Sequence, residues 1–270
     1  MKQNKLNENL WRREGLKKGQ DGVIVGCTHR QEWILPWWWM HYHFYNSLPV
    51  TFVDFGMSEK AKNWCKKRGE LVALEATDSL ILPKEKVDPK LATAWETLYP
   101  DFWQHRPGWF SKPFAFLKTP YERTIWVDLD CQVRTSLSEL FDKCENPAMI
   151  ALARDPYQYE GRKEAFALPD EITFNSGFVV YKHGSPIITQ WAEWTATRNA
   201  EFFGDQNILS RALHEKKLAF QELPITYNWL LVLGDKAAAR IRHFGGPQGK
   251  AQIKEEINAL NDLFLFNLTL

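Results

Sequence analysis

The first third of the chain alternates short apolar runs with helical stretches. Residues 23–25 (VIV) and 50–53 (VTFV) are predicted strands, with a helix expected between them over residues 35–45. A second helix, capped by Ser58, precedes a third apolar run at residues 71–74. This order is typical of parallel βαβ units, whose ligands gather at the carboxyl ends of the strands. The sequence therefore predicts an α/β fold with a mostly parallel, Rossmann-like central sheet flanked by helices.

Length and composition favour one folded domain. The chain has 270 residues, of which 44% are apolar, and this is enough for one large core. We expect a single domain over residues 21–270, preceded by a basic arm over residues 1–20. The charged residues of the arm are Lys2, Lys5, Arg12, Arg13, Lys17, Lys18, Glu8 and Glu14. Such an arm is either solvated or in contact with anionic lipid or an acidic partner.

The balance of charges and the missing phosphate motifs exclude several classes of protein. The 34 basic and 33 acidic residues nearly cancel, so no field attracts nucleic acid and no nucleic-acid partner is expected. Neither G-x-G-x-x-G after the first strand nor G-x-x-x-x-G-K-[ST] anywhere is found in the sequence. A dinucleotide-binding fold and a P-loop enzyme are therefore poorly supported.

The cysteines and the apolar runs indicate a soluble, cytoplasmic protein. Cys27, Cys65, Cys131 and Cys144 form no C-x-x-C pair and no zinc-finger spacing, which fits a reducing compartment. No apolar run reaches the roughly 18 to 20 residues that span a bilayer. The apolar tail over residues 260–270 is either a packed end or a peripheral contact with the inner face of a membrane.

Aromatic side chains crowd the first predicted helix. Trp37, Trp38 and Trp39 are followed within the same helix by further aromatic residues. Stacking on sugar rings is one interpretation, but at helical spacing these residues cover more than one face, which favours burial in the core.

Prolines punctuate the middle of the chain. They predict a loop-rich insertion over residues 76–108, near the functional site. A short helix over residues 112–118 is then expected to lead into the next strand. The prolines concerned are Pro83, Pro89, Pro100 and Pro107.

That strand, at residues 124–130 (TIWVDLD), ends in two carboxylates separated by one residue. In an extended backbone Asp128 and Asp130 point to the same face, while Leu129 points back to the interior. Two neighbouring carboxylates repel unless a cation lies between them, and a divalent metal that also binds substrate phosphates is the usual one. The alternative is a strand that simply runs out into an acidic turn.

Four short runs follow downstream of the two aspartates. They are residues 173–180 (TFNSGFVV), 204–207 (GDQN), 223–228 (LPITYN) and 243–250 (HFGGPQGK). With the D-x-D, their order resembles the glycogenin-like and lipopolysaccharide-galactosyltransferase-like family 8 of nucleotide-sugar glycosyltransferases, over about residues 22 to 250. The resemblance implies a single domain of GT-A type and a hexosyltransferase that uses a UDP-sugar donor.

The resemblance also implies a metal centre. Asp128, Asp130 and His243 match the ligands of Mn²⁺, or of Mg²⁺, beside the donor diphosphate. Imidazole together with carboxylates suits manganese better than magnesium. Taken alone, a histidine after a β-rich run is more often structural.

Further donor-binding roles follow from the same likeness. Lys112 matches a cation that reaches the phosphate or sugar, and Lys250, after Gly246, matches one that grips the diphosphate. Both would oppose the negative charge that develops on the leaving group, although a single lysine is as often a surface ammonium. Thr28, at the end of the first strand, would contact the uracil.

The sugar itself would lie against two of the downstream runs. Asn175, Ser176 and Gly177 resemble the strand that faces the sugar, where an amide reads a hydroxyl group and a glycine permits close approach. Asp205 and Gln206 match the acid–amide pair at the reactive face of the sugar. Their structural alternative is helix capping, since Asp205 precedes a helical run. No chemical role is predicted for the segment at residues 223–228.

The resemblance implies a metal-dependent transfer of the sugar to an unidentified acceptor hydroxyl, with retention of configuration. Lys112 would stabilise the leaving group, while Asp205 and Gln206 would stabilise the far face of the sugar.

Two other functions stay open at this point. One is a non-catalytic domain of the same fold that binds nucleotide or glycan. The other is a haloacid-dehalogenase-like phosphatase, in which D-x-D also ends a strand. That class has Thr or Val four residues after the first Asp, whereas this chain has Gln132.

Overall fold

The computed structural model describes residues 15–74, 78–99, 101–159 and 166–264. Within these residues the strands form one seven-stranded and one three-stranded sheet. The strands are β1 (Lys17–Cys27), β2 (Val50–Asp54), β3 (Glu70–Ala73), β4 (Tyr121–Val127), β5 (Cys131–Val133), β6 (Ile150–Arg154), β7 (Phe174–Lys182), β8 (Gln221–Leu223), β9 (Trp229–Leu230) and β10 (Ile241–His243).

The large sheet has the strand order β3-β2-β1-β4-β7-β6-β8. β1 pairs in parallel with β2 and β4, β2 with β3, and β6 with β8, so the sheet is mostly parallel as predicted. β7 runs antiparallel to both of its neighbours, β4 and β6. β4 and β6 therefore point in the same direction, and their carboxyl ends lie at the same edge of the sheet as the amino end of β7.

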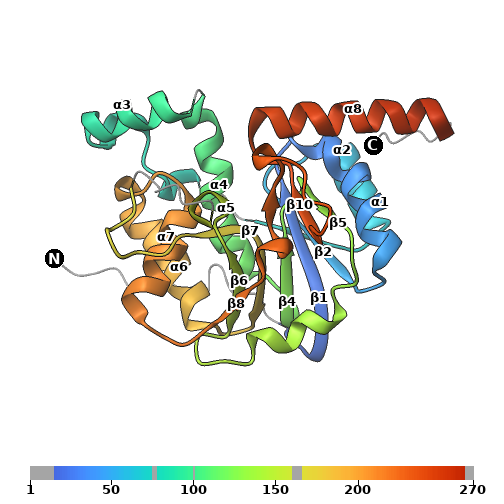
Figure 1. Cartoon of the computed structure of the whole chain (residues 1–270), viewed down its shortest axis with the longest axis horizontal. Coiled ribbons are helices and arrows are strands. Elements are labelled where there is room, and N and C mark those ends of the chain that lie inside the picture. The colour runs from blue at the N-terminus through green and yellow to red at the C-terminus, as the bar shows by residue number, and fades with distance from the viewer. Residues whose placement is uncertain (1–14, 75–77, 100, 160–165, 265–270) are drawn as a thin grey trace.

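Helices cover both faces of this sheet (Figure 1). Trp37 of α1 and Ala61 of α2 pack in the core on one face, while Phe116 of α4, Trp191 of α6 and Leu209 of α7 pack on the other. The α-helices are α1 (Leu35–Tyr45), α2 (Glu59–Lys66), α3 (Pro89–Leu98), α4 (Phe102–Leu117), α5 (Pro156–Tyr159), α6 (Pro186–Arg198), α7 (Asp205–Lys216) and α8 (Gly246–Phe264).

The alternation of side chains along the central strands builds these two cores. In β1, Val23 and Val25 are buried on the α1 side, whereas Ile24 is buried on the α4 side. β4 repeats the pattern, because Ile125 belongs to the first core and Trp126 to the second. A strand buried on both faces reads as a continuous apolar run, which is the signal that predicted β1, β2 and β4 from the sequence.

The first βαβ units agree with the sequence analysis. α1 has the predicted bounds, and α2 begins after Ser58, whose side chain accepts a hydrogen bond from the N–H of Ala61 at 3.2 Å. Trp37 and Trp38 are fully buried, so the tryptophan run serves mainly the core. Stacking contributes there, since the rings of Trp38 and Tyr42 are parallel at 5.0 Å.

The prediction of a loop-rich insertion over residues 76–108 is wrong. The described part of this segment is mostly helical, with α3 and the first half of α4. Pro89 occupies the first turn of α3, where no N–H is needed, and Asp88 caps that helix by accepting from two backbone N–H groups. Pro107 and Pro113 lie inside α4, which extends far beyond the short helix predicted at residues 112–118.

The two ends of the chain are only partly described. β1 already begins at Lys17, so Lys17 and Lys18 belong to the sheet and not to a solvated arm. The rest of the predicted arm, residues 1–14, lies outside the described residues, as do residues 265–270 of the apolar tail. Residues 260–264 of the tail form the last turn of α8. No helix in the described ranges combines the length and the apolar character needed to cross a bilayer.

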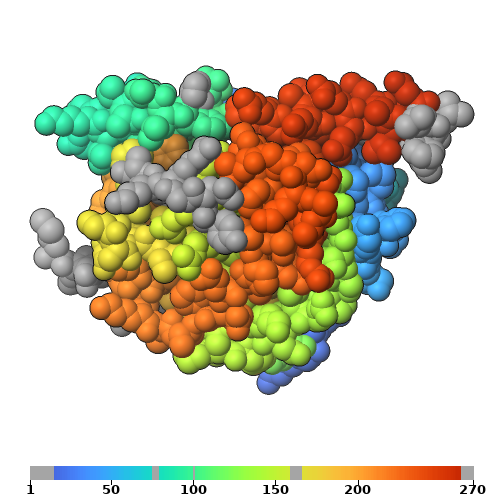
Figure 2. Space-filling view, viewed as in Figure 1, coloured from blue at the N-terminus to red at the C-terminus, as the bar shows by residue number. Residues whose placement is uncertain are grey.

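α3 and α8 lie along the same edge of the molecule, where Figures 1 and 2 show them as neighbouring parts of one border. α8 follows directly after β10, and α3 leads through α4 toward β4. Both helices are therefore connected to the strands that supply the predicted site.

Candidate active site

The D-x-D lies in a turn and not in a strand. β4 ends at Val127, and the chain turns over residues 128–130 before β5 begins at Cys131. The expectation that an extended backbone points Asp128 and Asp130 to the same face is therefore wrong. The turn instead directs the two carboxylates to different partners.

The small sheet explains how His243 reaches the aspartates from a distant part of the chain. β10 pairs antiparallel with β5, and His243 lies directly opposite Cys131. One residue later, the N–H of Phe244 donates to the carbonyl of Asp130 at 2.9 Å. Strand pairing thus fixes the imidazole beside the second aspartate.

Asp130 is held by two cationic or polar partners. Its Oδ1 lies 3.4 Å from Nε2 of His243, and its Oδ2 pairs with the ammonium of Lys250 at the start of α8. Burial alone would raise the pKa of Asp130, but Lys250 and His243 lower it well below its ordinary range. Asp130 is consequently an anion at all physiological pH values.

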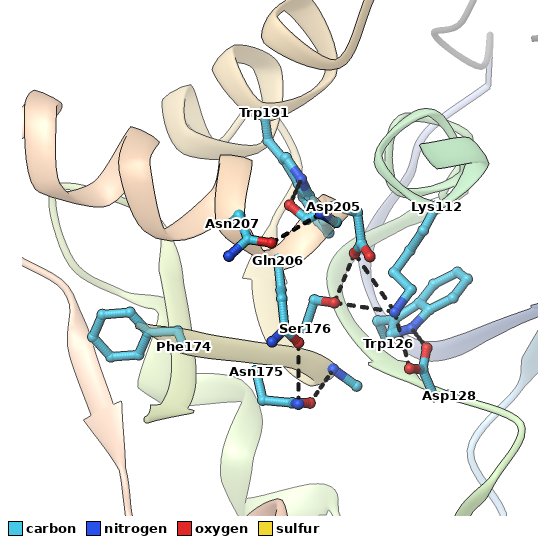
Figure 3. A network of polar contacts seen from close by, with 12 residues as sticks. Lys112, Trp126, Asp128, Phe174, Asn175, Ser176, Trp191, Asp205, Gln206 and Asn207 are labelled. Atoms are coloured by element: carbon cyan, nitrogen blue, oxygen red, sulfur yellow. Dashed lines mark hydrogen bonds and ion pairs between the residues drawn. The ribbon is translucent and has the colours of Figure 1, made fainter. Parts of the chain in front are cut away.

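Asp128 belongs to a second network around Lys112, shown in Figure 3. Nζ of Lys112 lies 2.9 Å from Oδ2 of Asp128, 3.1 Å from Oγ of Ser176 and 3.7 Å from Oδ2 of Asp205. Nε1 of Trp126 donates to the other oxygen of Asp128 at 2.6 Å. Burial would lower the pKa of Lys112, but the two carboxylates raise it above its ordinary value, so the ammonium stays charged.

Asp205 is the buried acid of this network. Its carboxylate accepts from the hydroxyl of Ser176 at 2.7 Å, and Nε1 of Trp191 donates to its backbone carbonyl at 2.8 Å. Burial raises the pKa of Asp205, and Lys112 partly opposes that change. The α7 N-terminus is capped through Gly204 and Asn207, so the side chain of Asp205 is free of the capping role that was its structural alternative.

Three polar side chains meet next to this network at the same edge of the sheet. Asn175 at the start of β7 donates through Nδ2 to Oε1 of Gln206 at 3.1 Å. Nε2 of Gln206 in turn donates to Oδ2 of Asp155 at 3.1 Å. Asp155 follows β6, and burial raises its pKa although hydrogen bonds oppose the rise. The carboxyl ends of β4 and β6 thus place Asp128 and Asp155 on either side of Asn175.

The donor atoms of the site determine whether a divalent metal fits there. Among the described residues, ligand atoms of Asp130, Cys131 and His243 lie within 4.8 Å of one another. The 3.4 Å between Asp130 and His243 is close to the roughly 3 Å edge between adjacent ligands of an ion with bonds of about 2.1 Å. Asp130 and His243 therefore fit a shared ion. Asp128 faces Lys112 and Trp126 and must turn to join them.

No protein-family model and no curated protein sequence matches the chain. Solved structures match its fold. The galactosyltransferase LgtC, in complex with donor and acceptor sugar analogues, aligns with a TM-score of 0.57 and 14% identity, over 87% of this chain and 94% of LgtC. Mouse xyloside xylosyltransferase 1 aligns with a TM-score of 0.52 and 15% identity, over 85% and 99% of the two chains. GlyE of Streptococcus pneumoniae TIGR4 aligns with a TM-score of 0.53 and 14% identity, over 84% and 55%.

The chain has the GT-A glycosyltransferase fold. The fold that the sequence motifs predicted is therefore confirmed. In this GT-A fold, the two networks lie where β4, β6, β7 and the small sheet meet, and the predicted residues at positions 112, 128, 130, 175, 176, 205, 206, 243 and 250 all take part in them.

Gly177 has a local role in addition to the predicted one. A Cβ at this position would lie 2.5 Å from Cε1 of His243, so the glycine admits the imidazole ring. Close approach of a sugar was the predicted reason, whereas the structure gives a protein side chain as the neighbour. The missing side chain in β7 is thus needed for the placement of His243.

Thr28 and Gly246 belong to neither of the two networks described above. Thr28 follows β1, and its methyl group lies near Gly108 of α4. Gly246 opens α8 with a φ of +72°, a conformation that glycine adopts without strain. Their predicted contacts with the donor stay predictions.

The sequence analysis missed two residues of this candidate site. Asn228 was given no chemical role, yet its Oδ1 lies 2.9 Å from Nδ1 of His243. Asp155 was not considered, although it follows a strand in the same manner as Asp128. The rule that ligands gather at strand ends would have found Asp155, whereas Asn228 gives no sequence signal beyond its motif.

Proposed function

We propose that the protein is a metal-dependent glycosyltransferase that moves a hexose from a UDP-sugar to an acceptor hydroxyl, with retention of configuration. The observation that carries this proposal is the meeting of Asp130, His243 and Lys250 beside the Lys112 network in a GT-A fold. An acidic group, an imidazole and two ammonium groups at one strand edge are the parts that a metal diphosphate requires.

Asp130 and His243, with Asp128, would hold the ion, which we take to be Mn²⁺ or Mg²⁺. Such an ion, when bound, neutralises the diphosphate and assists its departure. Lys250 lies next to Asp130 at the N-terminus of α8, which supports a contact of its ammonium with the same phosphates. Lys112 is charged and nearly buried, and its proposed role is to meet the negative charge of the leaving UDP.

The sugar-binding part of the proposal uses the second network. Asn175 and Gln206 offer amide groups, and Asp205 offers a buried carboxylate within the same group of contacts. A carboxylate in this position stabilises the positive charge that develops on the sugar as its bond to UDP loosens. Asp205 is held by Ser176 and Lys112, which supports an electrostatic role.

The activities of the structural neighbours support sugar transfer as the activity of this protein. LgtC is a galactosyltransferase solved with donor and acceptor sugar analogues, and the mouse protein is a xylosyltransferase. The haloacid-dehalogenase alternative has a specific difficulty, because Gln132 stands where that class has Thr or Val four residues after the first Asp.

The test is UDP release from a panel of UDP-sugars with and without Mn²⁺. We expect metal-stimulated release from one or a few donors, and loss of that stimulation in Asp130→Asn. A matched control is Asp170→Asn, which removes the carboxylate of an exposed Asp–His pair with His214, at 3.9 Å. Release of inorganic phosphate would identify a phosphatase.

A second measurement separates catalysis from binding alone. Saturation with Mn²⁺ and a donor at a hundredfold above Kd should stabilise the fold by about 2.7 kcal/mol. Stabilisation without any UDP release, across a broad set of acceptors, would contradict the enzyme and leave a binding domain. Equal stabilisation of Asp130→Asn would contradict the metal assignment.

A further inference from the structure

A continuous chain of side-chain hydrogen bonds runs from Asp155 to His243. It passes through three neutral amides in the order Gln206, Asn175 and Asn228. Asn228 is fully buried and the other members are mostly buried, so few of these groups turn to water instead. Each amide has a donor end and an acceptor end, and a chain of amides therefore has a direction.

The direction is fixed first by the backbone of β7. The N–H of Gly177, which can only donate, lies 2.9 Å from Oδ1 of Asn175. The same Oδ1 accepts from Nδ2 of Asn228 at 2.7 Å. Nδ2 of Asn228 also lies 3.4 Å from the backbone carbonyl of Asn175, which can only accept. The N–H of Gly177 can only donate, and the carbonyl of Asn175 can only accept. Each of these groups therefore shows separately that Nδ2 of Asn228 faces Asn175.

The opposite end gives the same direction. The ionised carboxylate of Asp155 can only accept hydrogen bonds. Gln206 must therefore donate to it through Nε2, which lies 3.1 Å away. Gln206 then presents Oε1 to Nδ2 of Asn175 at 3.1 Å. Asn175 is left with Oδ1 for Asn228, as the first argument requires.

The direction of the amide chain determines which ring nitrogen of His243 faces a hydrogen-bond acceptor. With its Nδ2 engaged by Asn175, Asn228 presents only Oδ1 to Nδ1 of His243, at 2.9 Å. A neutral imidazole that meets an acceptor at Nδ1 carries its proton there. The other ring nitrogen, Nε2, then faces Asp130, 3.4 Å away, on the side where a cation would bind.

We propose that Asn228 is a positioning residue that holds His243 as the Nδ1–H tautomer and so presents Nε2 to a divalent cation. The proposal rests on the proposed function for the identity of the cation site. Second partners of this kind fix both the tautomer and the orientation of metal-binding histidines. The amide chain also connects the imidazole to Asn175 and Gln206, the residues proposed to contact the sugar.

The direct test is the ring ¹⁵N chemical shifts of His243 in the metal-free protein. Protein labelled at its seven histidines is measured over a range of pH. The resonances of His243 are assigned by their loss in His243→Gln. We expect Nδ1 to carry a proton at every pH, because it faces the acceptor Oδ1 of Asn228. An unprotonated Nδ1 would overturn the proposal without any variant of Asn228.

Variants of Asn228 add a second readout. Asn228→Leu removes the acceptor, so we expect the Nε2–H tautomer to appear and Mn²⁺ affinity, measured by EPR titration, to fall about 10- to 100-fold. Asn228→Asp retains an oxygen for Nδ1–H and should preserve the tautomer. Asn46→Leu is the matched control, because Asn46 is a buried amide that bonds Thr135 and Leu137 in another part of the fold.

The outcomes separate this proposal from the proposed function. A protein that shows the Nδ1–H tautomer but releases no UDP would retain the positioning role and lose the enzyme. A protein that transfers sugar while Asn228→Leu leaves both the tautomer and Mn²⁺ affinity unchanged would lose the positioning role alone. A fall in Mn²⁺ affinity of the same size in Asn46→Leu would also overturn the assignment, since it would reflect general destabilisation.

Discussion

Replacement of Lys112 by methionine removes the cation that two buried carboxylates share. Nζ of Lys112 lies 2.9 Å from Asp128 and 3.7 Å from Asp205, and the side chains are 10%, 19% and 8% exposed respectively. Methionine has a similar length and no charge. We expect Lys112→Met to lower the free energy of unfolding markedly, because both carboxylates would remain buried without their counter-charge.

The magnitude follows from these distances. Coulomb's law at an effective dielectric constant of about 20 gives attractions of about 6 and about 4 kcal/mol at the two separations. The desolvation of the three charges offsets much of that attraction, and removal of one partner from a buried pair usually costs about 3–5 kcal/mol. We therefore expect a loss of about 4 kcal/mol near neutral pH.

Urea unfolding across a range of pH is the assay. Removal of Lys112 removes a group that lowers the pKa of Asp205, so the already raised folded-state pKa of Asp205 rises further. A raised folded-state pKa favours the fold at low pH and disfavours it at high pH. The deficit of Lys112→Met should accordingly be smallest below the unfolded aspartate pKa of about 3.9 and grow as pH rises.

The control is Lys182→Met, which breaks an exposed pair with Glu145. Those side chains are 26% and 45% exposed, and pairs of this kind contribute about 0–1 kcal/mol. A loss in Lys112→Met no larger than in Lys182→Met, or a deficit independent of pH, would refute the assignment of Lys112 as the shared counter-charge.

Three further changes test other contacts. Gly177→Ala would place a Cβ 2.5 Å from the ring of His243, so Mn²⁺ affinity by EPR should fall at least tenfold, and an unchanged affinity would contradict the packing argument. Burial, and to a smaller extent Arg134, lowers the pKa of His41 from 6.5 to about 4. The stability that depends on neutral His41 is therefore fully present above pH 6.5, and about 3 kcal/mol of it is lost as the pH falls through 4. His41→Leu should abolish this loss in urea unfolding. Ser58→Ala removes the N-cap of α2 and should cost about 1 kcal/mol in urea unfolding, where no change would exclude the cap.

The fold was predictable where burial produces a simple pattern of apolar residues in the sequence. The runs 23–25 of β1 and 52–53 of β2 are apolar and fully buried, and Ser58 marks a helix start by a local hydrogen bond. Such features depend on neighbours in sequence. The order of strands, with β7 antiparallel between β4 and β6, depends on packing far along the chain and was not read from any local pattern.

The structure brings most of the predicted site residues together, but the motifs did not predict their geometry. Motif order indicated Asp130, His243 and Lys250 together, and the pairing of β5 with β10 joins them. The same motif treated Asp128 as equivalent to Asp130, whereas the turn after Val127 gives them different partners. A turn of three residues changes side-chain direction without any change in the spacing of the carboxylates.

Asn228 shows why a buried polar contact leaves little trace in a single sequence. An amide has no charge and no titration, so composition and charge patterning do not mark it. Its importance arises from a strand-to-strand path through Asn175 that exists only in the folded chain. The prolines are an example of the opposite error, because a local signal for a loop was overruled by packing. Pro89 starts a helix, and Pro107 and Pro113 lie within one.

The two prolines inside α4 bear on the order of folding. Each removes a backbone hydrogen bond and disfavours an isolated helix by about 3 kcal/mol, so a peptide of Phe102–Leu117 should be unstructured in water. Burial of Phe110 and Phe114 against neighbouring elements supplies the missing stabilisation. α4 therefore forms only when those elements are assembled, and Lys112 arrives with it. Amide hydrogens of α4 should exchange only through opening of that assembled structure.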